Sequence, residues 1–193
     1  MQLEDIALTF VPQLGVRGIV HLMEVFGSAA AVYSASAEEL RQRAKLRDDV
    51  VRNIVTHSGI SEAERELEYC SRYNITPLAS TDEKYPKLLR QIDDYPHILY
   101  VRGSVEALQR RMVAFVGTRK ISAYGERVCN EMIHSLAEAV PDVAIVSGLA
   151  YGVDGAAHRA ALTEDVTTVG VIANPLPNVT PAANERLAAE IVG

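Results

Sequence analysis

Several features that would assign this chain to a specialised class of protein are missing from its sequence. No apolar stretch approaches the ~20 residues that a membrane-spanning helix requires. Residues 1–5 are acidic and lack the basic segment that opens a secretory signal. We therefore expect a cytoplasmic protein without a membrane partner.

Cysteine is also scarce, since the chain contains only Cys70 and Cys129. Each falls within an expected helix, and the pair forms no metal-binding or redox motif. Buried free thiols in a reducing compartment are the expected state. No Ser–His–Asp set, metal cluster or pair of catalytic carboxylates is visible either, so the sequence predicts no enzyme chemistry, no metal and no cofactor.

An excess of positive charge is absent too, because the formal net charge is -6 at pH 7. This balance argues against a strongly basic protein that coats nucleic acid without selectivity. It leaves room for a local positive groove, because phosphate contacts depend on a few residues at short range. With 193 residues, of which 48% are hydrophobic and 23% charged, the chain is ordinary globular material. That length suits one large domain or two small ones.

The first part of the chain reads as helices joined by short loops. Ser36 and Glu39 have the spacing of a capping box ahead of an apolar residue. We predict a small all-helical domain over residues 1–74. Its expected helices cover residues 6–10, 18–25, 38–46, 50–57 and 62–73.

Residues 11–18 form a joint that resembles a helix–hairpin–helix, with Gly15 and Gly18 near the turn. Such a joint can present backbone amides at a helix N-terminus to a phosphate. It can equally be a tight turn that packs two small helices. The residues of this stretch by themselves favour the tight turn.

From residue 75 onward the pattern becomes an alternation of short apolar strands and helices. Such alternation is typical of an α/β fold, here a Rossmann-like, doubly wound parallel sheet over residues 75–193. The chain ends one helix after the third consecutive strand, so we expect the sheet to be incomplete. The expected strands of this unit cover residues 112–116, 143–146 and 168–172, and the expected helices cover 124–140, 154–162 and 181–192.

Two glycine-containing loops follow the first two of these strands. In the first, residues 116–125, Gly117 permits a sharp turn, Arg119 offers a planar cation suited to phosphate, and Ser122 is placed to cap the next helix. In such sheets the carboxyl ends of the strands are where ligands bind.

The second loop, residues 147–158, contains Gly148 and Gly152 at a spacing that lets amides surround an anion. Asp154 is expected to cap the following helix. His158 lies one turn into that helix and is either a phosphate or base contact or a packed histidine. Neither loop matches a dinucleotide or P-loop motif, and each alone would be read as a structural turn. Together, at adjacent strand ends, they favour one shared anion site.

The two loops also resemble the signature of the DNA processing protein A (DprA/Smf) family. The resemblance extends to residues 85–89 and 98–103, and the hairpin at 14–17 is similar to a helical module found in many members. After the third strand this chain keeps Pro181 and Asn184 of the family pattern but lacks its tyrosine and glycines. The resemblance to the family covers nearly the whole chain.

This resemblance implies single-stranded DNA binding, loading of the RecA recombinase onto incoming DNA in natural transformation, and self-association through the Rossmann-like domain. Lys120, Asp154, His158 and Asn184 are further candidates that support the site. The implied nucleic-acid contacts are Gly117, Thr118, Arg119, Ser122, Gly125, Ser147, Gly148 and Gly152.

Two alternatives remain open on the sequence. One is a nucleotide-cleaving enzyme of the phosphoribohydrolase-like Rossmann type, although the Pro-Gly-Gly-x-Gly-Thr-x-x-Glu motif typical of such enzymes is absent here. The other is a protein-binding module centred on the N-terminal helices.

Overall fold

The computed structural model describes residues 2–193, which divide into two compact units. The first unit ends at Val101 and the second begins at Arg102. The expected boundary between residues 74 and 75 lies just after the last helix of the first part, which ends at Arg72, whereas the division by contacts falls before the last residue of the second strand that follows. Within the described residues, no helix is both long and apolar enough to cross a membrane.

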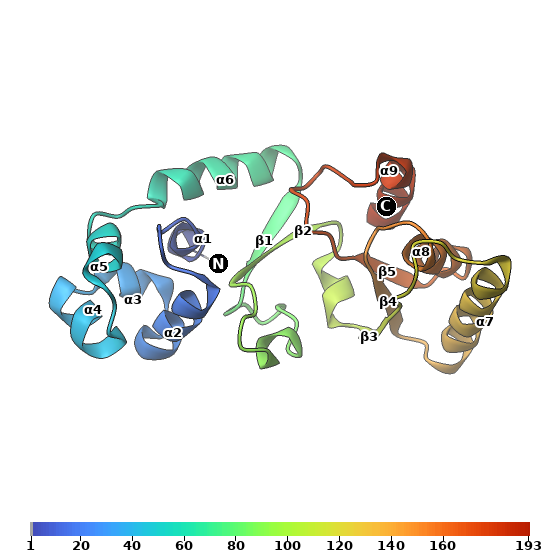
Figure 1. Cartoon of the computed structure of the whole chain (residues 1–193), viewed down its shortest axis with the longest axis horizontal. Helices are drawn as coiled ribbons and strands as arrows, with labels where there is room; N and C mark the ends of the chain where they lie inside the picture. The colour runs from blue at the N-terminus through green and yellow to red at the C-terminus, as the bar shows by residue number, and fades with distance from the viewer. Residues whose placement is uncertain (1) are drawn as a thin grey trace. The chain divides into compact units, whose positions relative to one another are not determined.

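The first unit is a layer of helices followed by a two-stranded sheet (Figure 1). A 3₁₀ turn, η1 (Leu89–Gln91), lies between the two strands. The unit comprises α1 (Leu3–Thr9), α2 (Val16–Phe26), α3 (Ala29–Ser34), α4 (Ala37–Ala44), α5 (Asp48–Val55), α6 (Ile60–Arg72), β1 (Ile75–Ala79) and β2 (Ile98–Arg102).

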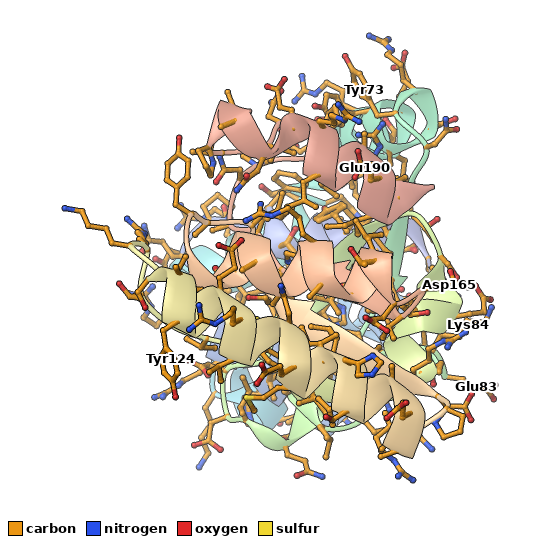
Figure 2. All side chains as sticks on the ribbon, turned by 90° about the vertical axis from the view of Figure 1, so that its right-hand side faces the viewer. Tyr73, Glu83, Lys84, Tyr124, Asp165 and Glu190 are labelled. Atoms are coloured by element: carbon orange, nitrogen blue, oxygen red, sulfur yellow. The ribbon has the colours of Figure 1, made fainter. Side chains whose placement is uncertain are left out.

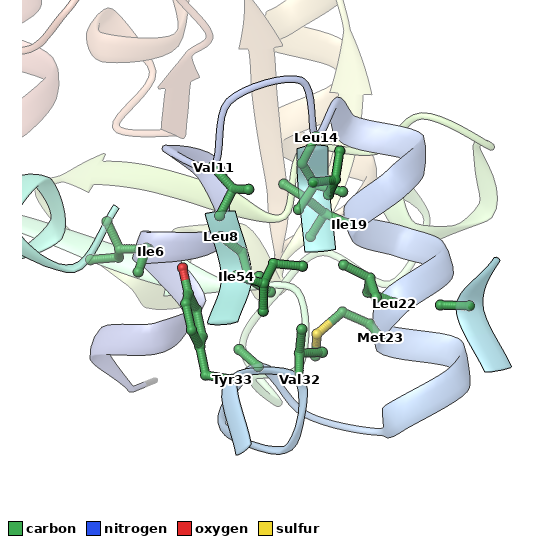
Figure 3. Packing of buried hydrophobic residues seen from close by; sticks show 14 of the residues in the cluster. Ile6, Leu8, Val11, Leu14, Ile19, Leu22, Met23, Val32, Tyr33 and Ile54 are labelled. Atoms are coloured by element: carbon green, nitrogen blue, oxygen red, sulfur yellow. The ribbon is translucent and has the colours of Figure 1, made fainter. Parts of the chain in front are cut away.

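Apolar positions from α1, α2, α3 and α5 converge in the core of this unit (Figure 3). Ile6, Leu22, Val32 and Ile54 are all fully buried. The sequence predictions omitted α3, which is only six residues long and therefore too short to show helical periodicity. Its Ser28 cap accepts a hydrogen bond from the Ala31 amide at 3.2 Å.

The predicted capping box at the start of α4 is confirmed. The Ser36 hydroxyl accepts a hydrogen bond from the Glu39 amide at 3.2 Å, and the Glu39 carboxylate accepts one from the Ser36 amide at 2.9 Å. Local side chains thereby satisfy two backbone amides at the N-terminus of α4.

A buried polar cluster of Asp5, Ser80 and His97 ties α1 to the strands. Ser80 Oγ lies 2.8 Å from His97 Nδ1, and His97 Nε2 lies 3.4 Å from Asp5 Oδ1. Burial raises the pKa of the Asp5 carboxyl, but the hydrogen bonds from His97 and the Gln2 amide outweigh it and hold that pKa below its ordinary value. The three residue types of a hydrolytic triad thus meet here, although no motif in the sequence signals it. All three are buried, so we interpret the cluster as a structural clamp.

The second unit is built on a parallel sheet with the strand order β3-β4-β5. Because the order does not reverse and such crossovers are right-handed, the crossover helices α7 and α8 share one face of the sheet. Figure 2 shows α7, α8 and α9 side by side. The unit comprises η2 (Val105–Gln109), β3 (Arg111–Ala114), α7 (Ala123–Ala139), β4 (Val143–Ser147), α8 (Val153–Thr163), β5 (Thr167–Gly170), η3 (Ala182–Asn184) and α9 (Glu185–Val192).

The core of this unit lies between that helix layer and the sheet. Ile133 of α7 and Ile145 of β4 are fully buried, and small residues of α8 such as Ala157 let the helix approach the strands closely. Cys70 and Cys129 are free and buried, as predicted. The α/β class with a parallel sheet after a helical region is likewise confirmed.

Candidate functional site

The two glycine loops meet directly beyond the carboxyl ends of β3 and β4. Gly152 has φ 80° and ψ -128°, a conformation open to glycine and strained for other residues. A Cβ at Gly152 would lie 2.1 Å from the Thr118 carbonyl oxygen and 2.7 Å from Arg119 Cα. The Val153 amide also donates to that Thr118 oxygen at 3.1 Å. The second loop therefore holds the backbone of the first loop in place.

Gly117 allows the same close approach from the other side. A Cβ at Gly117 would lie 2.5 Å from Cγ2 of Val153, and Val153 is the first residue of α8. The two glycines thus let the loops interlock, and the predicted adjacency of the loops is what the structure shows. This contact also places Thr118 and Arg119 beside the N-terminus of α8.

The first loop leaves its cations facing solvent. Arg119 and Lys120 are exposed, and neither side chain makes an ion pair within residues 2–193. Ser122 caps α7 as predicted, since its hydroxyl oxygen accepts from the Gly125 amide at 3.1 Å. The hydroxyl proton of Ser122 and the amides of Ala123 and Tyr124 remain available to an anion.

In the second loop, Ser147 and Gly148 have mainly structural positions. The Ser147 hydroxyl is buried and donates to the Phe115 carbonyl at 2.6 Å, which ties the end of β4 to the residue after β3. A Cβ at Gly148 would lie 2.6 Å from Asp154 Oδ2, so the glycine makes room for that carboxylate. A bound anion would reach the backbone of this loop rather than the Ser147 hydroxyl.

The prediction that Asp154 caps α8 is wrong. The N-cap is Gly152, the helix begins at Val153, and no side chain makes a capping hydrogen bond there. The positive φ of Gly152 turns the chain into the helix before Asp154 is reached, and the first helical amide is bonded to Thr118 instead. Asp154 is then the second helical residue, where its negative charge interacts favourably with the helix dipole.

His158 and Asn184 support the second loop from the interior. His158 is fully buried, with Nε2 3.0 Å from the Gly148 carbonyl oxygen and Nδ1 2.7 Å from Thr168 Oγ1. Burial lowers its pKa, so the ring is neutral at pH 7. A neutral ring has one proton, and because a carbonyl only accepts, Nε2–H donates to Gly148. The Thr168 hydroxyl has one proton and two acceptors within reach, His158 Nδ1 at 2.7 Å and the Ile145 carbonyl at 3.0 Å. Of the two interpretations of His158, the packed histidine is the correct one.

Asn184 is buried at the start of α9, far from the loop in sequence. Its Nδ2 donates to the Leu149 carbonyl at 2.7 Å and to the Ala150 carbonyl at 3.2 Å. Both carbonyls belong to the second glycine loop, so Asn184 fixes the shape of that loop without reaching its outer surface.

The charges around the loops favour an anion over the first loop. Asp154 places a carboxylate beside the N-terminus of α8, which offsets the positive end of that helix dipole. The N-terminus of α7 also has a carboxylate in its first turn, Glu126, but it is preceded by two cations, Arg119 and Lys120, and is capped by a neutral serine. The most positive part of this surface therefore lies between Arg119 and the start of α7.

Two exposed aromatic residues at the same loops were missed by sequence reasoning. Tyr124, at the start of α7 (Figure 2), is 69% exposed, and Tyr151 in the second loop is 53% exposed. The Arg127 guanidinium lies 6.0 Å from the centre of the Tyr124 ring. Large aromatic residues inside glycine loops would have been the signal, because such loops leave little core to bury them. Exposed rings beside cations suit stacking with nucleic-acid bases.

Comparison with known proteins points in one direction. Residues 76–193 match the family described as DNA recombination-mediator protein A. Protein Smf of Escherichia coli (strain K12) is 37% identical over 129 residues, which is 67% of this chain and 34% of that protein. The putative DNA processing protein DprA of Mycobacterium tuberculosis (strain H37Rv) is 34% identical over 176 residues, covering 82% of this chain and 44% of that protein.

The fold comparison covers more of the chain. The X-ray structure of DNA processing protein A (DprA) from Streptococcus pneumoniae superposes with a TM-score of 0.76 at 26% identity, over 99% of this chain and 64% of that chain. The matched regions make up less than half of the two curated relatives named above.

Proposed function

Because the chain belongs to the DNA recombination-mediator protein A family, we propose that the surface formed by its two glycine loops binds the backbone of single-stranded DNA. In this proposal Arg119 and Lys120 contact phosphate oxygens. The amides at the start of α7 and the Ser122 hydroxyl donate hydrogen bonds to the same strand. Contacts of this kind bind without sequence preference.

The observation that carries this proposal is the interlocked pair of loops. Gly152 and Gly117 bring Thr118 and Arg119 against the start of α8 and leave the Arg119 side chain exposed and unpaired within residues 2–193. A cation on a fixed backbone costs less ordering on binding than one on a mobile loop. Loops fixed at strand ends are also where open α/β sheets bind their ligands.

In this proposal, the exposed rings favour a single strand over a duplex. Tyr124 and Tyr151 are exposed in or beside the two loops, and bases of a single strand are free to stack on such rings. In a duplex the bases are already stacked and paired, so only the backbone contacts would remain. We expect each ring to contribute about 1–3 kcal/mol to binding of a single strand.

Loading of RecA onto bound DNA and self-association of the chain belong to the same proposal. These two roles are supported by the family membership only. The curated relatives are longer than the regions that match this chain, and the matched regions do not include all of those proteins. A direct test follows the assembly of RecA on a labelled single strand with and without this chain. Faster assembly is expected, and unchanged kinetics would refute RecA loading by this chain.

The binding proposal is tested by fluorescence anisotropy with a labelled oligothymidylate and with a duplex of equal length. Arg119→Gln is expected to weaken single-strand binding by about 1–3 kcal/mol, the value of a charge-assisted contact. Its effect on the log–log salt dependence should be a loss of about 0.7 in slope.

Arg110→Gln is the matched control. Arg110 is exposed and directly precedes β3, at the opposite end of that strand from Arg119. Arg110→Gln changes the net charge by the same amount as Arg119→Gln. Because Arg110 lies away from the glycine loops, the affinity of this variant for DNA should match that of the wild type. Equal losses in the two variants would show that only net charge matters and would refute a site at Arg119.

A further inference from the structure

The first unit contains a cavity of ≈ 610 Å³ at the joint between α1 and α2. Its walls come from the hairpin at residues 13–18, from the turn at residues 45–47 between α4 and α5, and from Val50 and Asp94. All of these residues belong to the first unit. The cavity therefore shares no lining residue with the glycine loops of the second unit.

Positive charge dominates the lining of this cavity. Arg17, Lys45 and Arg47 are exposed cations, whereas Asp94 is the only carboxylate in the lining. Arg47 has a long ion pair with Asp49, at 3.5 Å, and neither Arg17 nor Lys45 forms an ion pair within residues 2–193. Three cations around one hollow repel each other, and an anion between them would relieve that repulsion.

The backbone adds hydrogen-bond donors, and their partial charge is positive like that of the side chains. The N-cap of α2 is Gly15, which has no side chain to satisfy the amides of Val16, Arg17 and Gly18. The first turn of α2 contains no acidic residue, and Arg17 adds a cation where the helix dipole is already positive. A phosphate at this point would interact favourably with the amides and with the side chain.

The hairpin is anchored in the core of the first unit by buried apolar side chains. Leu14 and Ile19 are buried on either side of the turn (Figure 3). A Cβ at Gly18 would lie 2.7 Å from Leu14 Cδ1, so Gly18 is what lets Leu14 fold under the start of α2. The amides and Arg17 are therefore presented on a fixed scaffold, which a recognition site needs.

The lining favours a ligand that has both an anionic and an apolar part. A single phosphate ion would fill a small part of ≈ 610 Å³. Leu14, Val16 and Leu46 also line the cavity, and Val16 is 41% exposed, so an apolar wall stands beside the cations. A nucleotide unit has both features, because its phosphate is anionic while its sugar and base have apolar faces.

We propose that this cavity binds a phosphodiester group of a single DNA strand and is a second strand contact of the chain. The inference extends the proposed function, since it supposes that DNA is the ligand, but it does not depend on Arg119.

The test removes the three cations with substitutions suited to each backbone position. Arg17→Gln keeps a good helix former, Lys45→Asn suits the left-handed φ of 52°, and Arg47→Ser puts a capping residue at the N-cap of α5. The control is Arg52→Gln/Arg65→Gln/Arg72→Gln, which removes three exposed cations of the same unit outside the cavity. Both variants have the same net charge.

Binding to a labelled oligothymidylate is measured by anisotropy in the full chain that also carries Arg119→Gln. The cavity variant should bind at least fivefold more weakly than the control variant and should lose about 0.7 from the salt slope, the contribution of one neutralised phosphate. Asp94→Asn should act in the opposite direction and tighten binding. Equal affinities of the cavity and control variants would overturn the proposal, whatever Arg119→Gln does by itself.

A direct measurement uses ¹H–¹⁵N NMR of the full chain. Oligothymidylate is expected to shift the amide signals of Val16, Arg17 and Gly18 at concentrations where inorganic phosphate does not. If inorganic phosphate at equal phosphate concentration shifts them as strongly, the cavity is a site for the free ion and the assignment to a DNA strand is wrong. Absence of any shift with the oligonucleotide would likewise overturn it.

Discussion

Replacement of Gly152 by alanine should separate the two glycine loops. The new Cβ would stand 2.1 Å from the Thr118 carbonyl oxygen and 2.6 Å from the Arg119 carbonyl carbon. Both neighbours are backbone atoms, which cannot rotate away as the end of a side chain can. The first loop must therefore move or Gly152 must change its conformation, and either movement breaks the 3.1 Å hydrogen bond from Val153 to Thr118.

The magnitude follows from these contacts. A non-glycine residue held in this region of φ and ψ costs about 1–3 kcal/mol, and loss of the Val153 hydrogen bond costs about 1 kcal/mol. We expect Gly152→Ala to lower the free energy of unfolding of the second unit by about 2–4 kcal/mol. A unit of this size loses about 4–8 °C in Tm for each kcal/mol, so Tm should fall by at least about 8 °C.

Gly155→Ala is the matched control, three residues further along α8. Its Cβ would lie 3.1 Å from Arg159 Nη1, the movable end of a long side chain, and 3.5 Å from a carbonyl oxygen at ordinary contact distance. Alanine is favoured over glycine inside a helix by up to about 1 kcal/mol. This variant should match the wild type in Tm or exceed it.

Thermal unfolding followed by circular dichroism measures both variants, and hydrogen exchange over residues 147–163 localises the effect. Affinity for oligothymidylate should fall in Gly152→Ala although every cation is retained. If both variants unfold at the same temperature, the interlocking of the loops does not stabilise the unit, and the contact of Gly152 with the Thr118 backbone has no role in fixing the site.

Three further predictions concern the supports of the fold. Burial holds the pKa of His158 below its ordinary value of 6.5, so the unfolded chain takes up its proton first; stability is full above about pH 6.5 and falls below it, and a His158→Asn variant should show a smaller loss between pH 7 and pH 5 in urea unfolding. Asn184→Ala removes two hydrogen bonds to the second glycine loop and should destabilise the unit by about 1–3 kcal/mol; faster hydrogen exchange at residues 149–151 is the check, and unchanged exchange would contradict the role of Asn184. Ser36→Ala removes the capping box of α4 and should cost about 0.5–2 kcal/mol of the stability of the first unit, whereas a Tm equal to that of the wild type would contradict it.

Much of the fold could be read from local patterns. The strands at residues 143–147 and 167–170 overlap the short segments predicted at 143–146 and 168–172, and the order of strand and helix implies parallel pairing. The Ser36–Glu39 box and the Ser122 cap are interactions over three residues, so the spacing alone reveals them. The six-residue helix α3 escaped because it makes less than two turns, and its helical state depends on burial of Val32 and Tyr33 in the core.

Which residues of the candidate site face the ligand was a different matter. The sequence by itself determined that two glycine loops follow consecutive strands and that the first loop contains Arg119 and Lys120. The order of strands along the chain and the position of a loop within it are local properties. Only the tertiary structure decided that Gly152 packs on the Thr118 backbone, that Gly152 rather than Asp154 begins α8, and that His158 is an interior support. These depend on contacts between residues that are 10 to 34 positions apart, where small differences in backbone angle decide which atoms meet. The cavity beside Arg17 has the same origin, since its cations come from two turns that only folding brings together.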